Sequence, residues 1–201
     1  MLEILKHWDL NIFFLINGHH TPFLDALMYP LTRMECWFPL LAVVIFFLFR
    51  HYHRRTWGIL LCFCLSILCT DRTSVAIKNA VQRPRPTHQT EIQDRVHVHV
   101  YADGSEYRGG HYSFPSSHAA NSFGLTVLLI GFFRPVTRHS WWMFPLWALI
   151  FCYTRIYLGV HYPSDICCGA LLGLAWGLLI YFLYRYLEKK QIINTNHHIK
   201  N

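Results

Sequence analysis

Long apolar stretches alternate with short clusters of charge along this chain of 201 residues. Five stretches are uncharged, or broken only by Asp71-Arg72, and they cover residues 36–49, 56–77, 109–133, 139–154 and 166–184. A helix needs about 20 apolar residues to cross a bilayer. Residues 109–133 and 166–184 reach that length alone, and the other three reach it with their flanks. The pattern predicts an all-α fold, a polytopic transmembrane helical bundle with five spans, forming a single membrane domain over residues 1–201.

The N-terminal segment, residues 1–35, fits this pattern less well. Residues 10–24 are uncharged but are interrupted by asparagine, glycine, histidine and proline. We expect either a sixth, short span or helices that lie in the membrane interface. The segment lacks the basic start and small-residue cleavage site of a signal peptide.

Composition supports a membrane protein and excludes several other classes. Hydrophobic residues make up 53% of the chain and charged residues 14%, whereas an ordinary soluble domain has about 25% charged residues. A disordered chain is excluded, because it needs low hydrophobicity and high charge. The apolar stretches leave almost no polar face for water, which argues against a soluble helical bundle or a nucleic-acid-binding domain. The lipid bilayer is therefore an expected partner, and nucleic acid is not.

The net charge of +7 is divided unevenly between the two sides of the predicted bundle. If the five stretches span, one side receives nine basic residues and one acidic residue, a net charge of +8. The other side, residues 71–111 and 155–165, has a net charge of +1. Cytoplasmic loops are enriched in Lys and Arg. We therefore expect a cytoplasmic tail at residues 188–201 and an external loop at residues 82–113.

The external loop contains a candidate hairpin. Residues 96–101 alternate Val with His and end in Tyr, and Asp103-Gly104 follows. This pattern predicts two short strands joined by a tight turn, with His97 and His99 on one strand face. The two histidines are either polar residues on a solvated face or a metal-binding pair.

Three groups of reactive residue types lie at the outer boundary of the predicted spans. They are Lys78 with Arg85-Pro86, Pro115-Ser116-Ser117-His118, and Arg155 with His161 and Asp165. The up-and-down topology alone brings all three groups to one face of the bundle. Each group by itself has a structural explanation, as a snorkelling anchor or a helix cap. Together they indicate a functional site, because ionisable residues at membrane depth are costly and usually functional.

These residue types suit a phosphate group. Arg85 and Arg155 offer planar guanidinium forks, and Lys78 offers a point charge. Ser116 is expected to be the N-cap of a helix, and the free N–H groups of its first turn would face an anion.

The remaining residues of the groups suit acid, base or nucleophilic chemistry. His161 and Asp165 are four residues apart, so the carboxylate can bond one imidazole nitrogen and leave the other as nucleophile or base. His118 is a second imidazole, available as general acid. The sequence offers no carboxylate cluster to hold Mg²⁺, so neither a metal nor a cofactor is expected in the reaction.

Over about residues 56–187, the sequence resembles the type 2 phosphatidic acid phosphatase family of membrane lipid phosphatases. The family signature is Lys-x6-Arg-Pro, Pro-Ser-Gly-His and Ser-Arg-x5-His-x3-Asp. This chain has Lys78-x6-Arg85-Pro86, Pro115-Ser116-Ser117-His118 and Thr154-Arg155-x5-His161-x3-Asp165. Ser117 replaces Gly and Thr154 replaces Ser, but a backbone N–H and a hydroxyl remain at these positions.

The resemblance implies a role for each residue. His161 would attack phosphorus and form a phosphohistidine, Asp165 would orient His161, and His118 would protonate the leaving oxygen. Five groups would hold the phosphate oxygens: Lys78, Arg85, Ser116, the Ser117 N–H and Arg155. The external residues Arg83, Arg95 and Arg108 are expected to help select the head group.

The resemblance also implies a metal-independent lipid phosphatase with an external active site, and the small size and lack of an Asn-x-Ser/Thr sequon suit a bacterial inner membrane. Undecaprenyl diphosphate is the first expected substrate. Lipid A, phosphatidylglycerophosphate and phosphatidic acid are the alternatives. A phosphotransferase from lipid to acceptor, or a non-catalytic lipid-phosphate binder or transporter, would use the same cations.

Overall fold

The computed structural model describes residues 2–134 and 141–199, so Arg138 and Lys200 of the predicted cytoplasmic side lie outside it. The α-helices of the described residues are α1 (Leu2–Asn17), α2 (Pro22–Thr32), α3 (Phe38–Tyr52), α4 (Thr56–Val81), α5 (Ser117–Phe133), α6 (Met143–Tyr157) and α7 (Pro163–Ile199). Short 3₁₀ helices are η1 (Met34–Trp37), η2 (His53–Arg55), η3 (Pro86–His88) and η4 (Gln93–Arg95).

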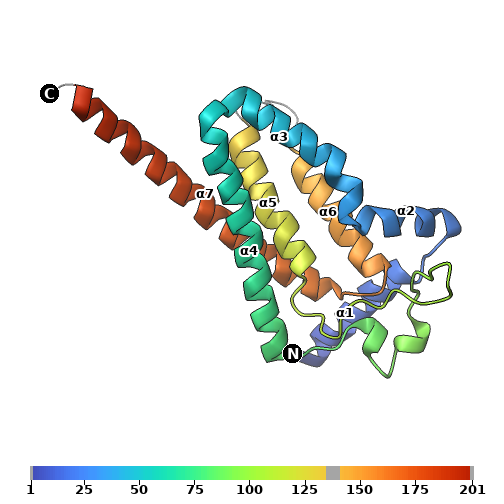
Figure 1. Cartoon of the computed structure of the whole chain (residues 1–201). Helices are drawn as coiled ribbons and strands as arrows, with labels where there is room; N and C mark the ends of the chain where they lie inside the picture. The colour runs from blue at the N-terminus through green and yellow to red at the C-terminus, as the bar shows by residue number, and fades with distance from the viewer. Residues whose placement is uncertain (1, 135–140, 200–201) are drawn as a thin grey trace.

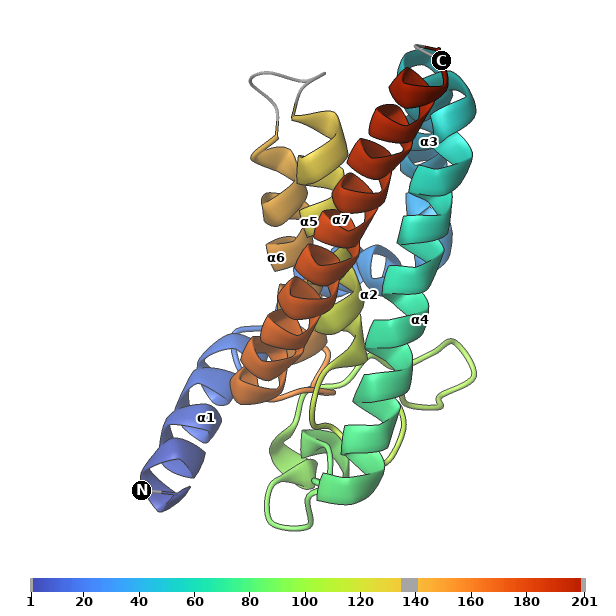
Figure 2. The same cartoon turned by 90° about the vertical axis from the view of Figure 1, so that its left-hand side faces the viewer.

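Helix α5 lies at the centre of a bundle with α4, α6 and α7, and its most extensive contact is with α7 (Figure 1, Figure 2). The segment between α4 and α5 folds beneath one end of this bundle, and the C-terminal end of α7 lies at the other (Figure 2). The predicted tail at residues 188–201 therefore begins as a continuation of α7, which reaches Ile199. The segment between α4 and α5 and the predicted tail therefore lie at opposite ends of the bundle.

The surface of the bundle is apolar where a soluble protein would be polar. The segments Met34–Val81 and Pro163–Lys190 are long and apolar enough to cross a membrane. Large apolar residues such as Phe46, Leu61 and Phe182 each have more than half of their surface exposed. Helices α5 and α6 have 17 and 15 residues, fewer than the roughly 20 of a full span. The protein is an all-helical membrane protein, and five or six spans remain a prediction.

The apolar stretch at 109–133 is not one helix. Its first residues run as an extended loop, and α5 begins only at Ser117. Gly109 has a positive φ of 66°, which suits glycine. The Ser116 hydroxyl accepts the N–H of Ala119 at 3.4 Å, so it caps the helix. The sequence correctly placed this cap, but the length of the apolar stretch overstated the helix.

The N-terminal segment contains two helices, not a single span over residues 10–24. Helix α1 ends at Asn17 and α2 begins at Pro22. Thr21 caps α2 by accepting the N–H of Leu24 at 3.2 Å, and Pro at the first helical position suits a new helix start. Helix α1 packs against α6 and α7, and α2 packs against α6.

The predicted hairpin lacks strands in the described part of the chain. One isolated bridge pairs Val100 with Glu106, and the Tyr107 N–H donates to the His99 carbonyl at 2.8 Å. No ladder extends past this turn because Asn17 takes the backbone groups of His97: its amide oxygen accepts the N–H at 2.9 Å and its amide nitrogen donates to the carbonyl at 2.8 Å. The alternation of Val and His therefore predicted a turn correctly and a strand pair incorrectly.

The glycines of α7 allow α5 to approach its backbone closely. A Cβ at Gly169 would lie 2.3 Å from the Ser116 carbonyl oxygen, and one at Gly173 would lie 2.2 Å from the Ala120 carbonyl oxygen. Small residues at four-residue spacing permit such close helix packing in membranes. This contact brings the start of α5 against the start of α7, where two of the three reactive groups lie.

Candidate functional site

The three reactive groups meet at the end of the bundle where α4 and α6 finish and α5 and α7 begin. The Ser116 N–H donates to the Asp165 carbonyl at 3.0 Å, which joins the second group to the third. Lys78 donates to the Pro115 carbonyl and, at 3.2 Å, to the Ser117 hydroxyl, which joins the first group to the second. The structure therefore brings together the residues that the sequence selected.

His161 and Asp165 form the buried centre of the site, with 1% and 0% of their surfaces exposed. The Nδ1 atom of His161 lies 3.5 Å from Oδ2 of Asp165. That carboxylate also accepts the Tyr162 N–H at 2.9 Å and, on Oδ1, the Arg83 guanidinium at 2.9 Å. These donors fix the carboxylate in place beside the imidazole, whose Nδ1 atom is buried and has no hydrogen-bond partner among the described residues.

The cations of the site act on His161 directly. Burial lowers the pKa of His161 well below its usual range, and the charges of Arg85, Arg155 and Lys78 lower it further. Burial and the neighbouring Arg155 lower the pKa of Arg85 to about 10, so this guanidinium is still charged at neutral pH. The result is a neutral imidazole surrounded by positive charge that favours binding of an anion.

The two arginines are buried and held by hydrogen bonds. Arg155 donates to the Thr32 hydroxyl and, at 3.0 Å, to the Tyr107 hydroxyl. Its Nε atom is buried and has no hydrogen-bond partner within the described ranges. Arg85 donates to the Val160 carbonyl at 3.3 Å, and Gly109 leaves room for it, since a Cβ there would lie 2.7 Å from its Nη1.

His118 lies in the first turn of α5, on the same side as these cations. Its ring stacks on Phe151 of α6, with centroids 5.6 Å apart and planes at 29°. Arg155, His161, Arg85 and Lys78 all act on it electrostatically. His118, at the start of α5, and His161, just before α7, are therefore close to the same cluster of cations.

Sequence reasoning missed one part of this site, the link from α1. Arg83 donates to Asp9 at 2.6 Å as well as to Asp165, and it also donates to the Ser164 hydroxyl at 2.7 Å. Asp9 is 5% exposed and accepts the Ser164 N–H at 2.8 Å. The available signal was an acidic residue between the apolar residues Trp8 and Leu10 of α1.

The other external arginines also have partners within the chain. Arg95 lies over the ring of Phe14, 4.6 Å from its centroid, and Arg108 donates to Glu106 at 2.8 Å. These contacts, like the bonds of Arg83, tie the three side chains to neighbouring residues of the chain. A role of the three arginines in selecting the head group stays a prediction.

Comparison with known proteins agrees with this arrangement. Residues 55–189, which contain all three reactive groups, match the family model of the PAP2 superfamily. A lipid A 4′-phosphatase from Bacteroides thetaiotaomicron is 37% identical over 196 residues, which cover 94% of this chain and 83% of that protein. A lipid A 4′-phosphatase from Porphyromonas gingivalis is 32% identical over 191 residues, covering 94% of this chain and 78% of that protein.

A solved structure shares the fold. The crystal structure of LpxE from Aquifex aeolicus superposes with a TM-score of 0.64 at 27% identity, covering 85% of this chain and 93% of that chain. The family model, the relatives and this structure agree on one family. The chain belongs to the PAP2 superfamily and is a phosphatase.

Proposed function

We propose that this protein removes a phosphate group from lipid A, or from a closely similar phosphorylated glycolipid, through a phosphohistidine on His161. The observation that supports the proposal most strongly is the buried His161–Asp165 pair beneath three cations, Lys78, Arg85 and Arg155. A phosphoryl group needs a nucleophile and positive charge around its three outer oxygens. This cluster offers both.

Phosphate binding uses the groups already in place. Arg85, Arg155 and Lys78 hold the outer oxygens, where charge develops in the transition state. The Ser117 N–H, at the start of α5, adds a donor that has no partner within the helix. Ser116 accepts a hydrogen bond from Ala119 and keeps its own hydroxyl proton for a phosphate oxygen.

The reaction proceeds in two steps and needs no metal. The Nε2 atom of His161 attacks phosphorus, the bond from phosphorus to the lipid oxygen breaks, and His118 gives that oxygen a proton. Asp165 bonds the Nδ1–H of His161 and stabilises its positive charge. The distance of 3.5 Å in the free protein shortens as charge develops, since catalytic hydrogen bonds tighten in the reacting complex. Water then attacks phosphorus and gives a proton to His118, which restores it, while the bond from phosphorus to Nε2 of His161 breaks and inorganic phosphate leaves.

The relatives favour lipid A over the first substrate that the sequence suggested. Undecaprenyl diphosphate was expected first, but two lipid A 4′-phosphatases match 94% of this chain. We therefore assign the 4′-phosphate of lipid A as the preferred target, with undecaprenyl diphosphate and phosphatidylglycerophosphate as weaker substrates. The apolar outer surfaces of α4 and α7 leave the lipid chains of the substrate in the bilayer.

The placement in the membrane follows from charge. Arg55 and Arg185 pair with Glu188 at 3.0 and 3.3 Å at the end of the bundle opposite the site. Under the positive-inside rule this basic end is cytoplasmic. The site then opens on the periplasmic side of the bacterial inner membrane, and α7 ends in the cytoplasm.

Phosphate release by the purified, full-length protein in detergent tests this proposal. Lipid A, undecaprenyl diphosphate, phosphatidylglycerophosphate and phosphatidic acid are compared by kcat/KM, with and without EDTA. We expect lipid A to give the highest value and EDTA to have no effect. Higher turnover of another lipid overturns the substrate assignment, and phosphate transfer to an acceptor without release of free phosphate identifies a phosphotransferase.

A further inference from the structure

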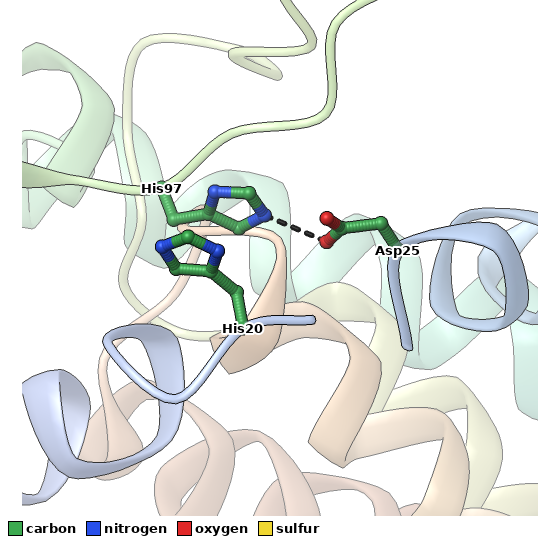
Figure 3. A group of neighbouring side chains, drawn as sticks. All are labelled: His20, Asp25 and His97. Atoms are coloured by element: carbon green, nitrogen blue, oxygen red, sulfur yellow. Dashed lines mark hydrogen bonds and ion pairs between the residues drawn. The ribbon is translucent and has the colours of Figure 1, made fainter. Parts of the chain in front are cut away.

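A second cluster of metal-ligating side chains lies outside the phosphate site. His20 comes from the turn between α1 and α2, Asp25 from the first turn of α2, and His97 from the external segment (Figure 3). One ligand atom of each lies within 4.8 Å of the other two. Segments more than 70 residues apart in sequence therefore converge on one point.

The donors of this cluster match the ligands of a zinc-class cation. Zn²⁺ binds imidazole nitrogen and carboxylate oxygen at about 2.0–2.2 Å, and many sites have three protein ligands and one water. Nε2 of His97 already lies 2.7 Å from Oδ1 of Asp25. The His20 ring stacks on the His97 ring, with centroids 3.8 Å apart. Because His20 is exposed, its ring can rotate out of the stack and bring a nitrogen to a shared cation.

Neighbouring groups orient two of the three ligands. The Tyr157 hydroxyl donates to Oδ1 of Asp25 at 2.6 Å. The Asn17 side chain holds the backbone of His97 on both its N–H and its carbonyl. Such supporting partners are typical of metal sites.

We propose that His20, Asp25 and His97 bind a divalent transition-metal ion, with Zn²⁺ as the best match. The ion replaces the direct contact between His97 and Asp25 and joins the α1–α2 turn to the external segment. It takes no part in the phosphate reaction, and the proposal does not depend on the identity of the lipid substrate. Its structural effect reaches the phosphate site because α2 also supplies Thr32, which holds Arg155.

Metal binding to chelator-treated, full-length protein in detergent tests the proposal. The chain has 14 histidines, so the informative quantity is the difference between matched variants, measured with Zn²⁺ by calorimetry and with Co²⁺ by its visible absorption. His20→Ala is the main variant, because this side chain is exposed and its removal leaves no buried space. His19→Ala, at the adjacent position, and His99→Ala, which removes a ring stacked on Tyr29, are the controls.

We expect wild type and both controls to bind one more equivalent of metal than His20→Ala and His97→Ala. Zn²⁺ should raise the unfolding temperature of wild type more than that of His20→Ala. Tyr157→Phe keeps the ligands but removes the hydroxyl on Asp25, so its affinity for Zn²⁺ should fall roughly 10–100-fold. Equal metal binding by wild type, His20→Ala and His97→Ala overturns the proposal, since the bound metal then lies at other histidines.

Discussion

Two His–Asp pairs among the described residues have different surroundings. His161 and Asp165 have side chains that are 1% and 0% exposed, and three cations act on the imidazole. His97 and Asp25 have side chains that are 21% and 33% exposed, and their neighbours are His20, Tyr157 and Asn17. The first pair lies 3.5 Å apart and the second 2.7 Å apart.

The comparison shows that surroundings, more than residue type, determine what a His–Asp pair can do. Burial among cations gives a neutral imidazole facing an anion site, which suits nucleophilic attack on phosphate. Partial exposure beside a second imidazole suits a metal cation. A positive ion would be repelled at the first pair by its three cations.

The largest effect is expected at the buried pair. His161→Ala should lower kcat for lipid phosphate hydrolysis by about 10⁴-fold or more, since it removes the nucleophile. It should keep the extra equivalent of Zn²⁺, because His161 is not a ligand at the second pair. Phosphate release and calorimetry measure the two properties separately. Substantial turnover by His161→Ala would show that the nucleophile lies elsewhere, and loss of Zn²⁺ binding would show that the two pairs are not independent.

The next effect tests the helix contact that buries the first pair. In Gly169→Val the new side chain meets the Ser116 carbonyl, which a Cβ would approach to 2.3 Å. Overpacking of this kind costs about 1–3 kcal/mol, so the unfolding temperature and kcat should both fall. Leu171→Val, at a position of α7 that is 66% exposed, is the control and should change neither. Normal turnover by Gly169→Val would mean that the close approach of α5 and α7 is not required.

A smaller effect is expected from the α1 link to the buried pair. Asp9→Asn keeps the shape of the side chain but removes the charge that Arg83 shares between Asp9 and Asp165. If the poorer orientation of Asp165 raises the activation free energy by about 1.4 kcal/mol, kcat decreases roughly tenfold. KM should change less, because Asp9 does not touch phosphate. Asp103→Asn, in the turn at residues 101–105, is the control. Equal kcat and KM for the two variants would show that Asp9 does not support the site.

The smallest expected effect is on the pH dependence of stability, which differs between the two pairs. The pKa of His161 is lowered, so below about pH 6.5 the unfolded chain binds more protons than the folded one and stability falls as the pH decreases. The pKa of Asp25 is lowered too, so its contribution is lost only below about pH 4. Between pH 7 and 5, the unfolding temperature of wild type should fall more than that of His161→Asn. Equal decreases would contradict a buried, neutral His161.

Much of the catalytic site was predictable because its signals are local. The N-cap at Ser116, the four-residue spacing of His161 and Asp165 and the cations at span ends each follow from neighbouring residues and from an up-and-down topology. The role of Asp9 was not predictable in this way. Its partner Arg83 lies 74 residues away, and no periodicity or motif connects α1 to the start of α7.

The sequence by itself determined the class of the protein, an apolar helical bundle with three reactive groups at one end. It did so because hydrophobic length and residue spacing are properties of the chain. The tertiary structure alone decided that Ser116 of α5 contacts Asp165 of α7 and that Asp9 pairs with Arg83. It also decided that His97 lies beside His20 and Asp25 and does not pair with His99. These outcomes depend on contacts between distant segments, whose geometry follows from packing and not from local pattern.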